Sequence, residues 1–84
     1  MKYDVAVIGA GYVGVPLAAT FAEAGCHVLV VDVVEGVVEG LNRGESHIED
    51  VSNERWRPFV DGGLVRATTD YEELREAEAI LSEA

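Results

Sequence analysis

The chain has 84 residues, almost half of them hydrophobic and only two of them proline, a composition typical of one small globular domain and not of a disordered chain. Its 16 acidic residues outnumber six basic ones, and the net charge of −10 would repel nucleic acid and anionic membranes, so neither is expected as a partner. The acidity leaves two interpretations open, a protein adapted to concentrated salt or an ordinary acidic cytosolic protein.

The first expected elements are a buried strand over residues 3–8 and a helix that follows a glycine-rich turn. The strand is short, rich in β-branched residues and ended by Gly9. Its apolar run is too short for a signal-peptide core or a membrane span, so we expect a cytoplasmic protein. The helix is expected to end at Gly25. Its core-facing stripe is expected to be Val13, Leu17, Phe21 and Ala24.

A second apolar run, residues 26–32, reads CHVLVVD and predicts a strand of a parallel sheet that is covered on both faces. With the first strand and helix it makes a βαβ unit of about thirty residues. The single cysteine, Cys26, has no second cysteine in the chain with which to form a disulfide, and we expect a buried structural thiol. A further helix is expected over residues 34–44, with Gly44 as its stop.

The segment that follows is less regular. Ser52 is a candidate cap for a helix that runs to Val60, but Pro58 equally favours a broken or 3₁₀ segment. In either case Trp56 is expected to face the core. A third strand is expected over residues 64–68, where the sequence reads LVRAT.

The last fifteen residues, DYEELREAEAILSEA, permit two interpretations. Local propensity favours one amphipathic helix that begins near Asp70, where Thr69 and Glu72 match the S/T-x-x-E capping box. The alternative is a helix that ends near Ala77, followed by a short strand at residues 79–81. The single helix is the preferred prediction.

Three glycines, Gly9, Gly11 and Gly14, form the pattern G-x-G-x-x-G between the first strand and the first helix. Gly9 permits the sharp turn, Gly11 lets the backbone approach a pyrophosphate, and Gly14 lets the helix pack close to the strand. The N–H groups at the helix start then face the anion. Alone, the pattern is weak, because a tight turn without a ligand has the same glycines.

Asp32 strengthens this interpretation, because it ends the second strand eighteen residues after Gly14. A carboxylate at that place accepts hydrogen bonds from the adenosine ribose hydroxyls and would repel a 2′-phosphate. Val33 and Val34, the next two residues, offer no arginine for such a phosphate. The sequence therefore predicts a dinucleotide site that prefers NAD to NADP.

The stretches GAGYVGVPLA, LNRGES and LVRATTDYEEL resemble, in order and spacing, the N-terminal part of the UDP-glucose/GDP-mannose dehydrogenase family. The resemblance runs over about residues 2–80. It implies an α/β fold, a partial Rossmann-type doubly wound parallel sheet of about three strands with flanking helices. It also implies NAD as the cofactor. The implied NAD contacts are Gly9, Gly11, Gly14, the backbone N–H groups of Tyr12 and Val13, and Asp32.

Enzymes of this family oxidise the C6 hydroxyl of a nucleotide sugar to a carboxylate in two NAD-dependent steps, through a thioester on a cysteine. The stretch GESHI is similar to members that act on UDP-N-acetylhexosamines. Residues 1–84 are expected to be a single N-terminal half of the dinucleotide-binding domain, truncated before the fourth strand is complete. The family's catalytic groups would lie beyond it, so no catalytic residue is assigned and no dehydrogenase activity is expected of the chain alone.

One departure from the family concerns Val37, which stands where members usually carry a lysine near the adenosine ribose. His27 and His47 are expected to be partly exposed side chains without a catalytic role. The acidic residues of the tail are expected to form a solvated face, so no metal site is assigned.

Two functions remain open at this point. The chain is an NAD-binding piece of a nucleotide-sugar dehydrogenase, or it is a non-catalytic module that self-associates. In a sheet of strand order 3-2-1-4-5-6, the loss of strands 4–6 leaves the first strand, residues 3–8, as an exposed edge. Such an edge predicts a homodimer or higher oligomer.

Overall fold

The structure is a computed structural model and describes residues 1–82. Its centre is a parallel sheet of strand order β3-β2-β1-β4. The strands are β1 (Tyr3–Ile8), β2 (Val28–Val31), β3 (Val65–Thr68) and β4 (Ala77–Ser82). Val7 of β1 is paired with Val30 of β2 on one side and with Leu81 of β4 on the other. The predicted α/β class and parallel sheet are confirmed, with four strands in place of about three.

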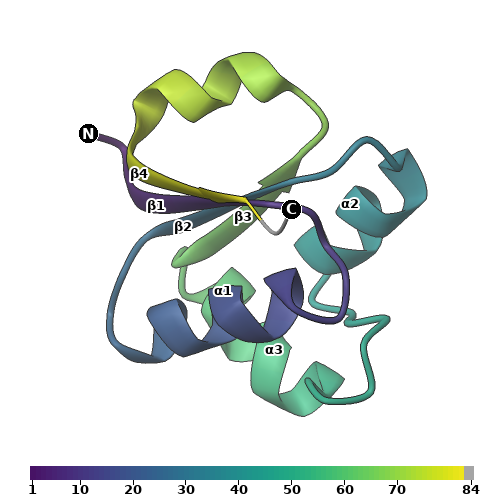
Figure 1. The fold of residues 1–84 in the computed structure, drawn as a ribbon. Helices are drawn as coiled ribbons and strands as arrows, with labels where there is room; N and C mark the ends of the chain where they lie inside the picture. Colours follow the sequence, from purple (N-terminus) through teal and green to yellow (C-terminus); the bar gives the residue numbers. More distant parts are fainter. Residues whose placement is uncertain (83–84) are drawn as a thin grey trace.

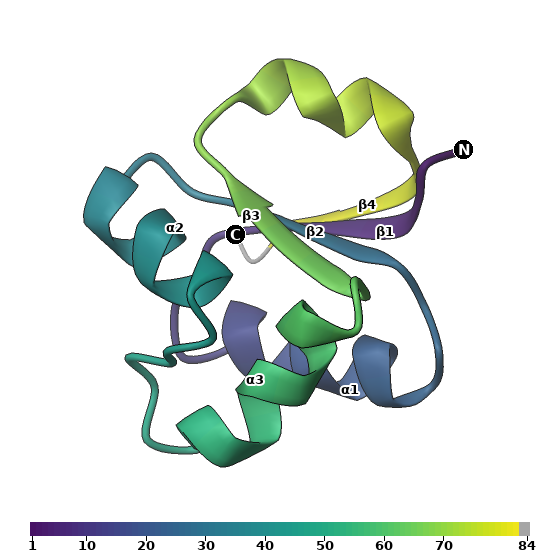
Figure 2. The same cartoon turned by 180° about the vertical axis from the view of Figure 1, so that it is seen from behind.

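Three α-helices lie on one face of the sheet, and a 3₁₀ helix lies on the other (Figures 1 and 2). The α-helices are α1 (Gly14–Glu23), α2 (Glu35–Asn42) and α3 (Asn53–Asp61). The 3₁₀ helix is η1 (Tyr71–Glu76). We call the side of α1, α2 and α3 the first face of the sheet and the side of η1 the second face.

The core of the first face is centred on Trp56 of α3, which is fully buried and whose indole N–H donates to the Leu41 carbonyl at 3.0 Å. Ser52 caps this helix, because its Oγ accepts a hydrogen bond from the Arg55 N–H at 3.1 Å. The helix continues through Pro58, so the helical interpretation of residues 52–60 is confirmed and the broken one is not. Burial of Trp56 and the Ser52 cap together outweigh the one backbone donor that proline removes.

Helix α1 forms where expected, but the face that it buries differs from the prediction. Its buried side chains are Val15, Ala18, Ala19 and Ala22. Val13 is exposed, whereas Leu17 and Phe21 are half-buried at the flanks. The predicted stripe was wrong because close packing of a helix on the sheet, which Gly14 permits, leaves room mainly for small side chains. Cys26 is half-buried and packs against this core.

The preferred prediction for the tail, a single helix, is wrong. The chain instead forms η1 and then β4, which pairs with β1 along its length. The N-cap of η1 is Asp70, whose Oδ1 accepts from the Glu72 N–H at 3.0 Å, and not the predicted Thr69. Backbone pairing with β1 outweighs the local helix propensity of these residues.

This pairing also corrects the expected edge of the sheet. Strand β1 lies between β2 and β4, so residues 3–8 are not an exposed edge. Among the described residues, β3 and β4 are the outer strands, and Ile80 and Leu81 of β4 are 50% and 38% exposed. Any pairing between copies of this chain through an open edge would therefore involve β4 or β3.

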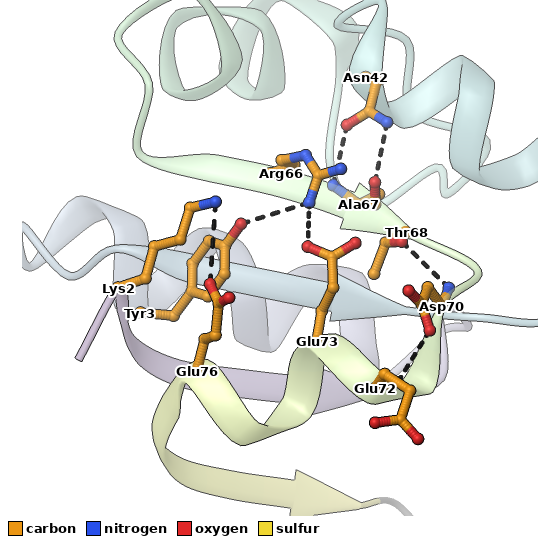
Figure 3. A network of polar contacts seen from close by, with 10 residues as sticks. All are labelled: Lys2, Tyr3, Asn42, Arg66, Ala67, Thr68, Asp70, Glu72, Glu73 and Glu76. Carbon is orange, nitrogen blue, oxygen red and sulfur yellow. Dashed lines mark hydrogen bonds and ion pairs between the residues drawn. The ribbon is translucent and has the colours of Figure 1, made fainter.

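Polar contacts connect η1 to the second face (Figure 3). Arg66 of β3 donates to the carboxylate of Glu73 in η1 and to the Tyr3 hydroxyl at 3.4 Å. Lys2 Nζ lies 3.8 Å from Glu76 Oε2. The apolar part of this face is small and consists of Tyr3, Ala6, Leu29, Val31 and Ala77, with Leu74 packed against it. The second face therefore combines a small apolar cluster with ion pairs and a hydrogen bond.

Candidate functional site

The carboxyl ends of β1 and β2 place the glycine-rich turn beside Asp32. The Gly9 N–H donates to the Val31 carbonyl at 2.8 Å, so β1 and β2 stay paired up to the turn. The Asp32 N–H in turn donates to the Thr68 carbonyl of β3 at 3.1 Å. The crevice at the carboxyl ends of parallel strands is where open α/β sheets bind ligands. The two parts of the predicted site are thus brought together.

The turn itself combines a glycine of positive φ with the start of a helix. Gly9 has a φ of 102°, a conformation that residues with a Cβ rarely adopt. Helical hydrogen bonds then begin, from the Val15 N–H to the Gly11 carbonyl at 3.2 Å and from the Leu17 N–H to the Val13 carbonyl at 3.0 Å. In this described stretch, Val13 provides no side-chain cap and the first turn of α1 holds no acidic residue. The positive end of the helix dipole is therefore not neutralised by the helix's own side chains.

Asp32 is fixed by two backbone N–H groups. Its Oδ2 accepts from the Ala10 N–H at 2.8 Å, and its Oδ1 accepts from the Val34 N–H at 3.0 Å. The residue is half-buried, so one side of the carboxylate still reaches solvent. Each carboxylate oxygen has two acceptor positions and can accept a second hydrogen bond. A pair of neighbouring hydroxyls, as on a ribose, is a suitable donor set for it.

Exposed apolar side chains flank this polar centre on both sides. Tyr12 and Val13 belong to the turn and are 77% and 57% exposed, while Val33 and Val34 follow Asp32 and are 72% and 52% exposed. Apolar surface beside convergent polar groups is typical of a small-molecule site. The predicted residues Gly9, Gly11, Tyr12, Val13, Gly14 and Asp32 thus belong to the glycine-rich turn with the start of α1 and to the end of β2, which the hydrogen bond between Ala10 and Asp32 joins.

Sequence reasoning missed one side chain of this region, His47. Its Nε2 lies 2.6 Å from the Ala10 carbonyl, so it contacts the turn from 37 residues away in the sequence. It is an exposed side chain with a partner, as expected, but the partner is the glycine-rich turn. No spacing pattern predicts such a contact, because it depends on the path of the loop between α2 and α3.

An open depression of about 280 Å³ lies between α2 and the loop that carries His47. It is lined by Gly36, Val37, Gly40, Arg43, Glu45, Ser46 and His47. Val37, at the position where the family usually has lysine, is half-buried and packs against the core. Arg43 Nη2 lies 3.2 Å from Glu45 Oε1, which balances the positive charge there. The depression therefore has no net cationic lining for a phosphate.

Within residues 1–82, no group of three or more His, Cys, Asp and Glu side chains is arranged to hold a metal ion. The same residues include no helix with the length and apolar character that a membrane crossing needs.

Comparisons with known proteins identify related dehydrogenases. The family model described as "UDP-glucose/GDP-mannose dehydrogenase family, NAD binding domain" matches residues 3–82. The UDP-glucose 6-dehydrogenase AglM of Haloferax volcanii is 40% identical over 76 residues, which are 90% of this chain and 18% of that protein. The UDP-N-acetyl-D-mannosamine dehydrogenase of Salmonella typhi is 44% identical over 66 residues, which are 77% of this chain and 16% of that protein.

A solved structure of a GDP-mannose dehydrogenase from Pseudomonas aeruginosa has the same fold, with a TM-score of 0.89 and 24% identity. The similarity covers 96% of this chain and 19% of that one. The chain therefore spans less than a fifth of the length of the relatives named here.

Proposed function

The chain belongs to the UDP-glucose/GDP-mannose dehydrogenase family as its NAD-binding domain, and on this premise we propose that it binds the adenosine-diphosphate half of NAD at the glycine-rich turn and Asp32. Gly9, Gly11, Gly14 and the backbone N–H groups of Tyr12 and Val13 receive the pyrophosphate. Asp32 accepts hydrogen bonds from the adenosine ribose. The observation that carries the proposal is the contact of Asp32 Oδ2 with the Ala10 N–H at 2.8 Å, because it joins the two halves of the site.

The residues present fit this cofactor. At the N-terminus of α1, Val13 provides no side-chain cap, and the first turn of the helix, which lies wholly in the described part, has no acidic residue to compete with an anion. The carboxylate of Asp32 can accept further hydrogen bonds from hydroxyls but would repel a 2′-phosphate, so NAD is preferred to NADP. When bound, NAD supplies a hydride acceptor to the reaction.

Within a protein as long as its relatives, this domain would serve the oxidation of the C6 hydroxyl of a UDP- or GDP-sugar to an acid. A UDP-sugar is the favoured substrate, because the two curated relatives described above are named for UDP-glucose and UDP-N-acetyl-D-mannosamine. The stretch GESHI, residues 44–48, favours the N-acetylhexosamine group of these sugars. No catalytic residue is assigned within residues 1–82.

Calorimetric titration of the chain with NAD tests the proposed site. The Asp32→Ala variant is expected to bind NAD about tenfold to a hundredfold more weakly, the loss of hydrogen bonds to a charged group. Asp61→Ala, which removes the same charge from an exposed position at the end of α3, is the control and is expected to bind like the wild type. Equal binding by the wild type and Asp32→Ala, or tighter binding of NADP than of NAD, would contradict the proposal.

The alternative function is that of a non-catalytic module that assembles into a homodimer or higher oligomer. The outer strand β4 supports it, because Ile80 and Leu81 are exposed on that strand. Sedimentation equilibrium with and without NAD separates the two functions. A monomer that binds NAD supports the cofactor site, and a tight dimer that ignores NAD supports the assembly module.

The acidic surface leads to a proposal about the setting in which the chain works. A net charge of −10 with a single lysine suits concentrated salt, where screening removes self-repulsion, and one 40% identical relative comes from Haloferax volcanii. The same charge argues against nucleic acid and anionic membranes as partners. The need for NAD favours the cytoplasm. Thermal unfolding in low and molar salt tests the adaptation to concentrated salt. The midpoint of unfolding is expected to rise in molar salt.

A further inference from the structure

The side chain of His47 reaches the middle of the glycine-rich turn. Its Nε2 lies 2.6 Å from the carbonyl oxygen of Ala10. Because a carbonyl oxygen only accepts hydrogen bonds, Nε2 carries the proton and donates it. Ala10 itself is buried, so the contact is made at the base of the turn and not at its outer surface.

Ala10 is held on both of its peptide groups. Its N–H donates to Asp32 at 2.8 Å, which fixes the peptide plane between Gly9 and Ala10. Its carbonyl accepts from His47, which fixes the next plane, between Ala10 and Gly11. A peptide group is planar, so the direction of the Ala10 carbonyl also sets the direction of the Gly11 N–H. Glycine backbones rotate easily, so such a plane is not set by local sterics alone.

The loop that carries His47 is itself firmly placed. Gly44 has a φ of 84° and ends α2, after which the Ser46 N–H donates to Asn53 Oδ1 at 2.7 Å. Ser46 Oγ then accepts from the Ile48 N–H at 3.1 Å. Ile48 and Val51 are buried in the core of the first face. The residues on either side of His47 are thus anchored, and the imidazole is presented to Ala10 without a need for further ordering.

We propose that His47 is a positioning residue of the NAD site, which fixes the Ala10–Gly11 peptide so that the Gly11 N–H is aimed at the bound pyrophosphate. This inference rests on the proposed NAD function. A hydrogen bond to the carbonyl of a peptide also polarises its N–H and strengthens it as a donor. Asp32 and His47 therefore hold Ala10 from its two sides. Asp32 also accepts hydrogen bonds from the ribose, whereas His47 acts on the pyrophosphate alone, through the turn.

The first test compares the NAD affinities of three variants of the full chain by calorimetry. His47→Ala is expected to bind NAD about threefold to tenfold more weakly, the effect of one neutral hydrogen bond. His47→Gln carries an amide N–H that can replace Nε2–H and is expected to restore the affinity to within about twofold. His27→Ala, which removes the other histidine from the opposite end of β2, is the control and is expected to leave the affinity unchanged.

Unchanged affinity in His47→Ala would overturn the inference. Equal losses in His47→Ala and His47→Gln would also overturn it, because they would point to the shape of the loop and not to the donated hydrogen bond.

The second test reads the peptide directly, without NAD, in ¹H–¹⁵N correlation spectra. The Gly11 amide signal is expected to move in His47→Ala, to stay near its wild-type position in His47→Gln and to be unmoved in His27→Ala. An unmoved Gly11 signal in His47→Ala would contradict the inference even if the wild type binds NAD. A wild type that fails to bind NAD would instead contradict the proposed function, and the Gly11 signal would still decide whether His47 fixes the turn.

Discussion

The two faces of the sheet are stabilised in different ways. The first face is covered by three α-helices and holds a large apolar cluster, in which Trp56, Leu41 and Val15 are fully or almost fully buried. The second face is covered by the short helix η1 and has only a small apolar cluster, next to the contacts of Arg66 with Glu73 and Tyr3. The stabilisation from apolar burial does not depend on charged groups, whereas the stabilisation from ion pairs changes with pH and salt. The βαβ framework that carries the NAD site therefore depends mainly on the first face.

The largest loss of stability is expected when the core of the first face is opened. Trp56→Ala removes a fully buried side chain and is expected to lower the free energy of unfolding by about 3–5 kcal/mol. Trp56→Phe keeps most of the packing but loses the hydrogen bond to the Leu41 carbonyl, and should cost less. Urea unfolding followed by circular dichroism measures both. A loss below about 1 kcal/mol in Trp56→Ala would contradict the assignment of this core.

A matched pair of leucine variants compares the two faces directly. Leu41→Ala, on the first face, is expected to cost about 2–5 kcal/mol, because Leu41 is 1% exposed. Leu74→Ala, in η1 on the second face, should cost less than about 2 kcal/mol, because Leu74 is only half-buried. The same unfolding experiment measures both variants. Equal losses would show that the second face is packed as firmly as the first.

The next effect concerns Asn42, whose amide acts like a neighbouring strand for the outer strand β3. Its Nδ2 donates to the Ala67 carbonyl at 2.9 Å, and its Oδ1 accepts from the Ala67 N–H at 2.8 Å (Figure 3). Asn42→Ala is expected to lower the free energy of unfolding by about 1–3 kcal/mol, because two backbone groups lose their partners. Asn42→Asp keeps only the acceptor, so it should lower the free energy of unfolding by less than Asn42→Ala does. Faster hydrogen exchange of the Ala67 amide in Asn42→Ala is the local measurement, and unchanged exchange would count against this role.

The smallest effect is expected at Glu73 and depends on pH. Burial raises the pKa of Glu73, but hydrogen bonds from Thr68 and Arg66 lower it more, so that the pKa lies below its ordinary value of 4.5. A carboxyl group with a lowered pKa stabilises the fold above its unfolded pKa, and this contribution disappears as the pH falls through the folded pKa.

Because the Arg66 side chain is half exposed, Glu73→Gln should cost less than about 1 kcal/mol at pH 7. The difference between wild type and variant should shrink when unfolding is measured below the ordinary pKa of 4.5. A difference that grows on acidification would have the wrong sign for this ion pair.

The βαβ unit of β1, α1 and β2 was largely predictable from the sequence, whereas β4 was predicted only as an alternative. The strand over residues 3–8, the glycine turn and Asp32 follow from local patterns, because each depends on neighbours in the chain. Strand β4 does not follow from such a pattern, because residues such as Ala77 and Ile80 favour helix locally. They form a strand only by pairing with β1. A strand whose stability comes from a partner some seventy residues away leaves only a weak local signature, here the short strand at residues 79–81 that was the alternative to a single helix.

In the candidate site, too, some residues could be predicted from the sequence and others could not. Gly9, Gly11, Gly14 and Asp32 could be identified because the fingerprint has a fixed spacing. The contacts of Ala10 with His47 could not, because the loop between α2 and α3 has no periodic pattern and its path depends on buried anchors such as Ile48. The LNRG stretch carries part of the family resemblance, and the structure explains its asparagine, Asn42, by the double hydrogen bond to β3.

The most direct test of the central claim is a titration of the ¹⁵N-labelled wild-type chain with NAD. The NAD site predicts the largest amide shift changes at Gly9, Gly11, Gly14 and Asp32, and little change at the opposite end of the sheet near Lys2 and His27. Saturable changes with that pattern would place the cofactor at the turn. No change at millimolar NAD, or changes concentrated near Lys2 and His27, would contradict the account.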